Sequence, residues 1–361
     1  MKAVVVDAIN EFSVQEVSLD APKTGEVMVA IKATGICRSD LSVINGTIPM
    51  ELPAVIGHEG AGIVQEVGPG VENVEVGDHV VLSFIPNCGT CFYCEHEQAN
   101  LCSAKDNANG FMLDGTARVK RDGEDLRVMT LLGCMAERCV APAISCVKID
   151  KDIPLAAAAL IGCGVMTGVG AVLNTAQVEA GSTVAVFGCG GIGLSIIQGA
   201  RIAGAKQVIA VDTMDSKLEM APGFGATHVV KGEDAQEFIL EHTEQRGADY
   251  CFEAVGIGAL MQQAEAATRP GGTCTVVGVG NMEDQFVLNP FTLPLFGKRV
   301  LGSMYGGCNP KRDFPRLLDF YRTGKLDLDG MITKTYSIDE APQAFADLRS
   351  GLNARGVIVY D

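Results

Sequence analysis

The sequence predicts an α/β protein made of a β-barrel-like domain and a doubly wound parallel sheet, and three observations support this. Residues 1–80 hold short strand-like segments separated by turns. From about residue 165 strands alternate with helices, and a glycine-rich turn joins the first strand and helix of that pattern. The 361 residues suffice for two domains with separate cores. We assign residues 1–164 and 305–361 to the first domain and residues 165–304 to the second.

Short apolar segments with β-branched residues predict the strands of the first domain, and Pro22 and Gly25 indicate a turn between two of them. The predicted strands lie at residues 2–6, 26–31, 62–68 and 77–82. Short strands at this spacing predict a compact barrel-like core. Residues 356–360 form a further strand, which we expect to return to this domain.

The second domain opens with a buried parallel strand at residues 183–187, followed by the turn Gly188-Cys189-Gly190-Gly191-Ile192-Gly193. A helix over residues 194–203 and a strand over residues 207–211 come next, and the strand ends on Asp212. Asp212 follows the last motif glycine at about the spacing of a dinucleotide fingerprint, roughly 20 residues. Strand, glycine turn, helix, strand and acid occur in the order that a Rossmann unit requires.

Each residue of this fingerprint has a separate physical role. Gly188 allows a tight turn, Gly190 lets the backbone approach a pyrophosphate, and Gly193 lets the helix pack closely. The helix N-terminus offers free N–H groups and a positive dipole end. Asp212 accepts hydrogen bonds from ribose hydroxyls and repels a 2′-phosphate, and neither Thr213 nor Met214 supplies a cation. The sequence therefore predicts NAD rather than NADP.

The rest of the chain continues the alternation. Further strands are predicted at residues 250–255, 273–278 and 299–303, and further helices at residues 260–268, 312–323 and 338–350. Residues 155–178 carry no charge, but several glycines interrupt them, so we interpret them as a buried helix joining the two domains rather than a membrane span.

Composition excludes several classes of partner. The formal net charge of −16 disfavours nucleic acid and anionic membranes. The N-terminal residues do not form a signal peptide, which predicts a cytoplasmic protein with reduced thiols. The thirteen cysteines are then expected to bind metal or to do chemistry where they cluster.

Four of those cysteines form a metal motif: Cys88, Cys91, Cys94 and Cys102, within a lobe of about residues 86–103. Four thiolates close a tetrahedral shell and leave no open position, which is typical of a structural zinc. A disulfide pair and an iron–sulfur cluster are the alternatives. His96 is expected to be a surface residue.

Cys37, the pair His58-Glu59, and Cys163 are further candidates, but each has an ordinary interpretation as a buried core residue. No rule of spacing joins positions so far apart in the chain.

The chain resembles the zinc-containing medium-chain alcohol dehydrogenases over nearly its whole length. The resemblance rests on Cys37-Arg38-Ser39-Asp40, Gly57-His58-Glu59-Gly60-Ala61-Gly62, the four-cysteine lobe, Gly162-Cys163-Gly164 and the glycine turn. It implies a GroES-like first domain and a catalytic zinc bound by Cys37, His58 and Cys163, with one open position. It also implies that Glu59 can approach the metal and that Asp40 orients His58.

The resemblance implies reversible oxidation of a primary aliphatic, allylic or aromatic alcohol to the aldehyde, with hydride transfer to NAD. Ser39 would relay the alcohol proton. Many relatives have a histidine five residues after the first zinc cysteine, but here that position is Ser42. We therefore expect the relay to end at Ser42, the cofactor ribose or water, without a histidine-like ionisation.

Further site residues are carried over from the same family. Arg38 and Arg355 match residues that bind the pyrophosphate, Lys217 matches one near the adenosine ribose, and Thr167 and Ile192 match residues that contact the nicotinamide. The apolar positions that would line the substrate pocket are Ile48, Phe84 and Met135.

Alternatives remain open at this point. One is a thiol-adduct (S-hydroxymethyl) formaldehyde dehydrogenase. Asp106 and Ile48 stand where the glutathione-dependent branch has an arginine and an acid, which disfavours a glutathione adduct and leaves an adduct of another thiol open. A nicotinoprotein that does not exchange its NAD and a silent NAD-binding scaffold are the others. The long segment from Cys102 to Cys163 resembles the larger class I and III members, which implies a homodimer joined through the cofactor domains.

Overall fold

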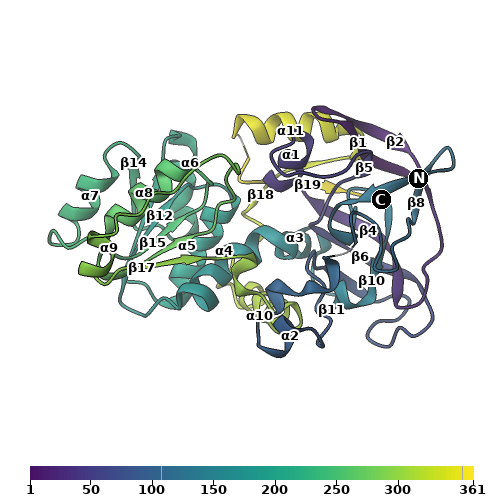
Figure 1. Cartoon of the computed structure of the whole chain (residues 1–361), viewed down its shortest axis with the longest axis horizontal. Helices are drawn as coiled ribbons and strands as arrows, with labels where there is room; N and C mark the ends of the chain where they lie inside the picture. Colours follow the sequence, from purple (N-terminus) through teal and green to yellow (C-terminus); the bar gives the residue numbers. More distant parts are fainter. Residues whose placement is uncertain (107, 352) are drawn as a thin grey trace. The chain divides into compact units, whose positions relative to one another are not determined.

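The computed structural model describes residues 1–106, 108–351 and 353–361, which form two compact units (Figure 1). Unit 1 comprises residues 1–163, 309–319 and 328–361, and unit 2 comprises residues 164–308 and 320–327. The first boundary lies one residue before the predicted one.

Unit 1 is built from two β-sheets. The first has the order β2-β1-β5-β9-β8-β3, and the second has the order β11-β7-β6-β4-β19-β18, with β10 paired to β4. The strands of the first sheet are β1 (Lys2–Ala8), β2 (Glu11–Glu16), β3 (Ser18–Leu19), β5 (Ala54–Val55), β8 (Val119–Arg121) and β9 (Glu124–Val128). Those of the second are β4 (Glu26–Gly35), β6 (Gly60–Val67), β7 (His79–Leu82), β10 (Arg138–Pro142), β11 (Cys146–Ile149), β18 (Ile332–Tyr336) and β19 (Arg355–Val359).

The C-terminal strand returns to the N-terminal half of the chain, as predicted. β19 pairs antiparallel with β4, and Val357 lies opposite Gly35. β4 is buried along nearly all of its length because the strands and helices around it cover both of its faces. The helices of unit 1 are α1 (Arg38–Ile44), α2 (Phe92–Glu95), α3 (Leu155–Leu160), α11 (Ala341–Ser350) and the first part of α10 (Pro310–Arg322).

Unit 2 holds a six-stranded parallel sheet of order β14-β13-β12-β15-β16-β17. This is the strand order of a Rossmann domain, whose order reverses between β12 and β15. The strands are β12 (Thr183–Phe187), β13 (Gln207–Asp212), β14 (His228–Lys231), β15 (Ala248–Glu253), β16 (Thr268–Val276) and β17 (Arg299–Gly302). The helices are α4 (Met166–Gly170), α5 (Gly191–Ala203), α6 (Asp215–Met220), α7 (Ala235–Glu241), α8 (Gly258–Ala267) and α9 (Thr292–Leu295).

The long apolar segment at residues 155–176 is a buried core helix, as predicted. Its length and composition would suit a membrane span, but the most apolar 18 residues of the helix are 89% buried inside the protein. Two π-helical turns, Ile161–Val165 and Ala171–Ala176, interrupt it, which the sequence analysis did not predict. Such turns often occur at functional sites, and the first contains Cys163.

The C-terminal part of the chain is divided differently from the prediction, which assigned all of residues 305–361 to the first domain. Residues 305–308 and 320–327 group with unit 2. Side chains of α5 hold the second segment: Gln198 Oε1 accepts a hydrogen bond from the Asp327 backbone N–H at 2.7 Å, and Arg201 donates to the Lys325 carbonyl at 2.6 Å. These bonds join residues more than 120 positions apart, which periodicity cannot reveal.

Candidate metal centres and cofactor site

The structure brings together the four dispersed residues that spacing could not connect. One potential ligand atom from each of Cys37, His58, Glu59 and Cys163 lies within 4.8 Å of those of the others, and all four residues are buried. Cys37 precedes α1 directly after β4, the pair His58-Glu59 lies between β5 and β6, and Cys163 lies in the first π-helical turn. Unit 1 therefore carries a complete set of two thiols, an imidazole and a carboxylate.

Asp40 fixes the geometry of this group. Its Oδ1 accepts a hydrogen bond from the Gly57 backbone N–H at 3.0 Å and lies 3.1 Å from His58 Nδ1. Its Oδ2 accepts a bond from the Cys37 backbone N–H at 3.2 Å. Because Asp40 is fully buried, one carboxylate contacts two candidate ligands, whereas the resemblance implied a contact with His58 alone.

The remaining atoms suit a zinc ion. His58 Nε2 is buried and has no hydrogen-bond partner among the described residues, which is costly unless a metal or another group fills that place. Hydrogen bonding with Cys163 and the charge of His58 hold the pKa of Cys37 well below its ordinary range, against the effect of burial. A thiolate beside a free imidazole nitrogen is the donor chemistry that zinc prefers.

Behind the ligands, Glu59 forms a buried ion pair with Arg355. Arg355 Nη2 contacts Glu59 Oε2, and both side chains are almost fully buried. Burial raises the pKa of Glu59 to about 7, while the charge of Arg355 opposes the rise. Arg355 Nε is buried and has no partner among the described residues, so a donor remains on this guanidinium. Its predicted contact with the pyrophosphate stays a prediction.

Gly35 makes room for this ion pair, and sequence reasoning missed it. A Cβ at Gly35 would lie 2.1 Å from Glu59 Oε2 and 3.1 Å from Arg355 Nη2. We expect Gly35→Ala to displace the Glu59 carboxylate from Arg355 toward the thiols. The zinc ion of the Cys37–His58–Cys163 group should then be lost to a chelator at least roughly tenfold faster, because the groups that contact metal ligands control how tightly the metal is held.

The control for this effect is Gly62→Ala, where a Cβ would meet the Ala30 carbonyl oxygen at an equal 2.1 Å without touching Glu59. That variant strains the pairing of β6 with β4, the strand that also contains Gly35, and it should release zinc like the wild type. The double variant Gly35→Ala/Glu59→Ala should release it no faster than Glu59→Ala alone. Chelator kinetics that are equal for Gly35→Ala and Gly62→Ala would contradict the assignment.

The predicted relay residues lie on α1. Ser39 is half-buried, and its Oγ lies 3.8 Å from Cys37 Sγ. Ser42 is half-buried one turn later, on the same face of the helix as Ser39. Arg38, predicted to bind pyrophosphate, is exposed at the start of the helix.

The three predicted pocket residues have different surroundings. The Phe84 ring meets the His58 ring edge-on, with centroids 5.7 Å apart. Ile48 is half-buried and lines a cavity of about 580 Å³. Met135 has no exposed surface and packs in a core cluster with Ile56 and Leu41, so its role in substrate binding stays a prediction.

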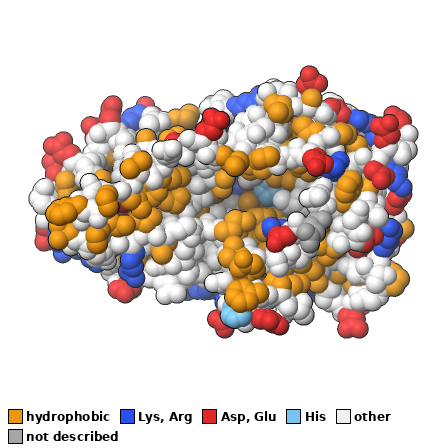
Figure 2. Space-filling model, in the orientation of Figure 1, with side chains coloured by type: hydrophobic (Ala, Val, Ile, Leu, Met, Phe, Trp, Pro, Cys, Tyr) orange, Lys and Arg blue, Asp and Glu red, His pale blue; other side chains and the backbone are white. Residues whose placement is uncertain are grey.

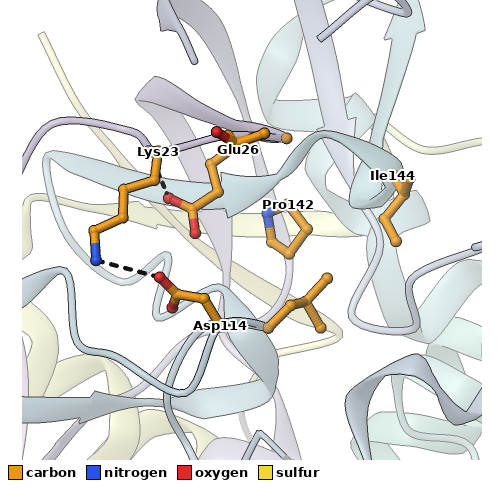
Figure 3. Close-up of a pocket in the computed structure, with 8 residues that line it drawn as sticks. Lys23, Glu26, Asp114, Pro142 and Ile144 are labelled. Carbon is orange, nitrogen blue, oxygen red and sulfur yellow. Dashed lines mark hydrogen bonds and ion pairs between the residues drawn. The ribbon is translucent and has the colours of Figure 1, made fainter. Parts of the chain in front are cut away.

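A second cavity of unit 1, of about 520 Å³, has a different character (Figure 3). Lys23 Nζ lies 3.2 Å from Asp114 Oδ2, and Glu26 Oε2 accepts a hydrogen bond from the Lys23 backbone N–H at 2.9 Å. Arg118, which is buried, pairs with both carboxylates. The charged side chains of this cavity therefore pair with one another.

The four-cysteine lobe also forms a compact donor group. Its ligand atoms lie within 4.8 Å of one another, and the Sγ–Sγ separations are 3.9 Å for Cys88–Cys94 and for Cys91–Cys102. A tetrahedron with zinc–sulfur bonds of about 2.3 Å has edges of about 3.8 Å, whereas a disulfide bond is only about 2.05 Å long. The separations therefore fit a single zinc ion and exclude the disulfide alternative. His96 is exposed, stacks on Phe92 and lies outside the group.

In unit 2 the glycine turn has the geometry that the fingerprint requires. Gly188 adopts a φ of 97°, which favours glycine, and a Cβ at Gly193 would lie 1.7 Å from the Gly188 carbonyl oxygen. A Cβ placed on Gly190 would have no atom of the described residues within 4 Å, apart from its own chain neighbours. The backbone is therefore open at Gly190, beside the first turn of α5, where a pyrophosphate would approach.

Asp212 is held by backbone donors at the end of β13. It accepts hydrogen bonds from the N–H groups of Cys189 (2.8 Å), Thr213 (2.8 Å) and Met214 (3.0 Å). Lys217 Nζ lies 3.8 Å from its Oδ2. Lys231, which was not predicted, lies opposite Asp212 in the register of the parallel strands and donates to the Thr213 carbonyl at 3.0 Å. Aligning residues 228–231 as the neighbouring strand could have found it.

Glu253 is another residue that sequence reasoning missed. It ends β15 and is fully buried, and its Oε1 accepts hydrogen bonds from the N–H groups of Val255 (2.8 Å) and Gly256 (2.7 Å). These bonds hold the turn that packs against Gly188 at the point where the strand order reverses. Of the predicted nicotinamide contacts, Thr167 is buried and Ile192 is half-buried.

Comparison with known proteins agrees with this geometry. Residues 23–151 match the alcohol dehydrogenase GroES-like domain family, and residues 191–323 match the zinc-binding dehydrogenase family. The chain is 42% identical to the NDMA-dependent alcohol dehydrogenase of Amycolatopsis methanolica, over 99% of this chain and 98% of that protein. It is 39% identical to the S-(hydroxymethyl)glutathione dehydrogenase of Paracoccus denitrificans, over 99% of both chains.

A solved structure shows the same likeness in three dimensions. The benzyl alcohol dehydrogenase of Acinetobacter calcoaceticus superposes with a TM-score of 0.94 and 32% identity, covering 100% of this chain and 99% of that one. The two donor groups, the GroES-like and Rossmann folds and these full-length relatives lead to one conclusion. The chain belongs to the zinc-dependent medium-chain alcohol dehydrogenase family.

Proposed function

We propose that the protein oxidises a primary alcohol reversibly to the aldehyde and passes the hydride to NAD. The observation that carries this proposal is the donor set of Cys37, His58 and Cys163, in which a buried imidazole nitrogen has no partner among the described residues. Three protein ligands leave one position for substrate, which a purely structural zinc does not need. The benzyl alcohol dehydrogenase likeness supports an aromatic or similarly apolar alcohol as substrate.

The residues of unit 1 have separate roles in this reaction. Zinc bound there supplies Lewis-acid polarisation of the alcohol hydroxyl. Asp40 keeps His58 in the tautomer that presents Nε2 to the donor set. Arg355 holds the Glu59 carboxylate beside the thiols, where it can move toward them. Phe84 presents an apolar face next to His58 and excludes water from that side.

The proton and the hydride leave by different routes. Ser39 lies beside Cys37, and its hydroxyl would accept the substrate proton while it donates its own proton onward. Ser42, one turn further along α1, would pass a proton to solvent in the same way. When bound, NAD would accept the hydride on its nicotinamide ring. Gly190 leaves the backbone open to its pyrophosphate, while Gly188 and Gly193 allow the turn and the close packing of α5. Asp212 offers a carboxylate to its ribose hydroxyls.

The experiment starts from protein purified without added cofactor. Zinc per chain and absorbance in the reduced-nicotinamide band are measured, and benzyl alcohol is then added with either free NAD or an artificial electron acceptor. Two zinc ions with turnover on free NAD are the expected result. One zinc ion per chain and no turnover on any alcohol would overturn the proposal and favour the silent scaffold.

Two rival activities have named relatives and are separated by the same assay. Bound nicotinamide with turnover only on the artificial acceptor would identify a cofactor that does not exchange. The likeness to the NDMA-dependent enzyme is the reason to test for this activity. Formaldehyde oxidation that requires a low-molecular-weight thiol would identify the S-hydroxymethyl activity of the Paracoccus relative.

We also propose a cytoplasmic homodimer joined through unit 2. Large apolar side chains are exposed between residues 279 and 296, and hydrophobic groups gather over α9 (Figure 2). Beside them β17 is an edge strand of the parallel sheet. An apolar patch next to an open strand edge is a suitable dimer surface.

The dimer is tested by sedimentation at micromolar concentration. We expect Phe291→Glu, at a side chain with 71% exposure, to shift the protein toward monomer because it places a charge in the patch. Val76→Glu changes a residue with 61% exposure on unit 1 and should leave the dimer intact. A wild-type monomer at this concentration would contradict the proposal.

A further inference from the structure

Two of the five histidines of the chain lie together in unit 2. His228 begins β14, the edge strand of the parallel sheet, and His242 directly follows α7, which packs beside β14 (Figure 1). His228 is half-buried and His242 is exposed. Their ring centroids lie 5.0 Å apart, and the ring planes form an angle of 63°. We call these two residues the histidine pair, and they belong to neither donor group described above.

The hydrogen bonds of His242 leave one of its ring nitrogens with a lone pair. Its Nδ1 lies 2.8 Å from the Phe238 backbone carbonyl, which can only accept, so Nδ1 carries a proton. The imidazole also stacks on the Phe238 ring, with centroids 3.9 Å apart, and this contact fixes its orientation. In the neutral ring Nε2 is therefore the nitrogen with the lone pair, and it has no hydrogen-bond partner among the described residues.

The surroundings of His228 select the same tautomer. Its Nδ1 lies 2.9 Å from Thr227 Oγ1. That hydroxyl accepts a hydrogen bond from the Val208 backbone N–H at 2.9 Å and donates its single proton to the Val208 carbonyl at 3.1 Å. His228 Nδ1 must then donate, since the Gln207 amide nitrogen, at 3.5 Å, lies beyond ordinary hydrogen-bond length. The lone pair is again on Nε2, which no described residue contacts by a hydrogen bond.

The separation of the two rings suits one metal ion between them. A bond from zinc to an imidazole nitrogen is about 2.05 Å long, so the ion would lie about 3.2 Å from each ring centre. Two rings on one ion then have centres about 4.5 Å apart at a right angle and about 5.2 Å apart at the tetrahedral angle. The observed 5.0 Å lies within this range. Histidines that bind metals almost always donate their other ring N–H, as both of these do.

The chemistry of the pair selects the class of ion. Burial and the neighbouring His242 lower the pKa of His228, which favours the neutral imidazole that a metal requires. Among the described residues no further cysteine, histidine or carboxylate joins the pair as a third ligand, so water would complete the coordination. Neutral imidazole nitrogens suit Zn²⁺, Ni²⁺ and Cu²⁺, whereas Mg²⁺ and Ca²⁺ prefer oxygen ligands.

We propose that the histidine pair binds one divalent transition-metal ion through its two Nε2 atoms, as a third metal site of this chain, and that the ion fastens α7 to β14. The ion would close the short segment from His228 to His242, which contains the whole of α7. A link of this kind restricts the unfolded chain and so favours the folded segment. The segment has need of such support, because β14 pairs with a neighbouring strand, β13, on one side only.

The test uses the zinc-loaded protein at neutral pH with Ni²⁺ as the probe, because bound Ni²⁺ can be counted separately from the zinc already present. Equilibrium dialysis with metal analysis gives the number of Ni²⁺ ions bound, and an indicator follows any release of zinc. We expect one Ni²⁺ per chain without release of zinc, weaker binding of Co²⁺, and no binding of Mg²⁺. Absence of saturable Ni²⁺ binding, or binding only in exchange for zinc, would overturn the proposal.

Two variants and a matched control locate the bound ion. His228→Gln and His242→Gln each remove one ligand and should weaken Ni²⁺ binding at least roughly tenfold, as the loss of even an indirect partner of a metal can do. The control is His96→Gln. His96 Nδ1 lies 2.7 Å from the Phe92 carbonyl and the ring stacks on Phe92, as His242 does on Phe238, but it has no histidine partner in the described part of the chain. It should bind Ni²⁺ like the wild type, and equal affinity of the wild type and the His228→Gln/His242→Gln double variant would overturn the site.

Hydrogen exchange tests the fastening without relying on any variant. Ni²⁺ should slow amide exchange in residues 228–242 of the wild-type protein and raise its unfolding temperature. Binding of Ni²⁺ with unchanged exchange in this segment would contradict the link between α7 and β14. Alcohol oxidation by the double variant should equal that of the wild type, so a failure of the proposed function leaves this test unaffected. Circular dichroism confirms that the variants compared have the wild-type fold.

Discussion

The variant Asp40→Asn is expected to weaken catalytic zinc binding about 100-fold and to lower kcat/KM for any alcohol at least as much. Asp40 accepts hydrogen bonds from two backbone N–H groups and meets His58 Nδ1 at 3.1 Å. An amide can satisfy only part of this set, because one of its two positions donates instead of accepting. Losing the partner of a metal-binding histidine typically costs about 10- to 100-fold in affinity or activity, and here the same carboxylate also positions Cys37.

Zinc content and affinity are measured by competition with a chelator, with the four-cysteine site as an internal reference that should keep its ion. The matched control is Asp78→Asn, another buried aspartate of unit 1, which accepts a hydrogen bond from the Glu75 backbone N–H and pairs with Lys148. It should affect folding stability without selective loss of one zinc. Selective loss in Asp78→Asn, or none in Asp40→Asn, would refute the role assigned to Asp40.

The sequence predicted most of the fold because its signals are local. The strand at residues 183–187, the glycine turn and the strand ending at Asp212 occur within one unit, and the structure confirms each of them. The return of the last strand to the first domain was also predicted, but its pairing with β4 was not. Residues 320–327 were predicted to belong to the first domain, but they group with unit 2. Hydrogen bonds to Gln198 and Arg201 of α5 hold them there, and no periodicity in the sequence predicts those bonds.

The candidate site likewise has one part that local spacing predicts and another that depends on contacts between distant residues. The four-cysteine lobe was predicted from spacing, since its ligands come from one short loop. Joining Cys37, His58 and Cys163 required the resemblance, because β4, the β5–β6 connection and a π-helical turn bring them together. Gly35 was missed because its importance is only that it lacks a side chain where Glu59 lies, and a glycine at the end of a strand gives no signal of this.

The cofactor preference offers the second large effect. We expect Asp212→Ser to lower kcat/KM for NAD about 100-fold, since hydrogen bonds to a charged group contribute about 1.5–3 kcal/mol each and the ribose would lose its carboxylate partner. The serine hydroxyl can still accept a bond from a neighbouring backbone N–H, which limits damage to the turn. Kinetics with NAD and NADP at fixed alcohol concentration measure the change.

The same substitution should raise kcat/KM for NADP about tenfold, because it removes a repulsive charge and leaves cations in place. Lys217 Nζ lies 3.8 Å from the Asp212 carboxylate, and Lys231 is the cross-strand neighbour of Asp212. Adding Lys217→Met to Asp212→Ser should remove the gain for NADP but not restore NAD. Glu219→Gln, which removes one negative charge from an exposed position of α6, should change neither preference. A gain for NADP that survives Lys217→Met would place the phosphate-binding cation elsewhere.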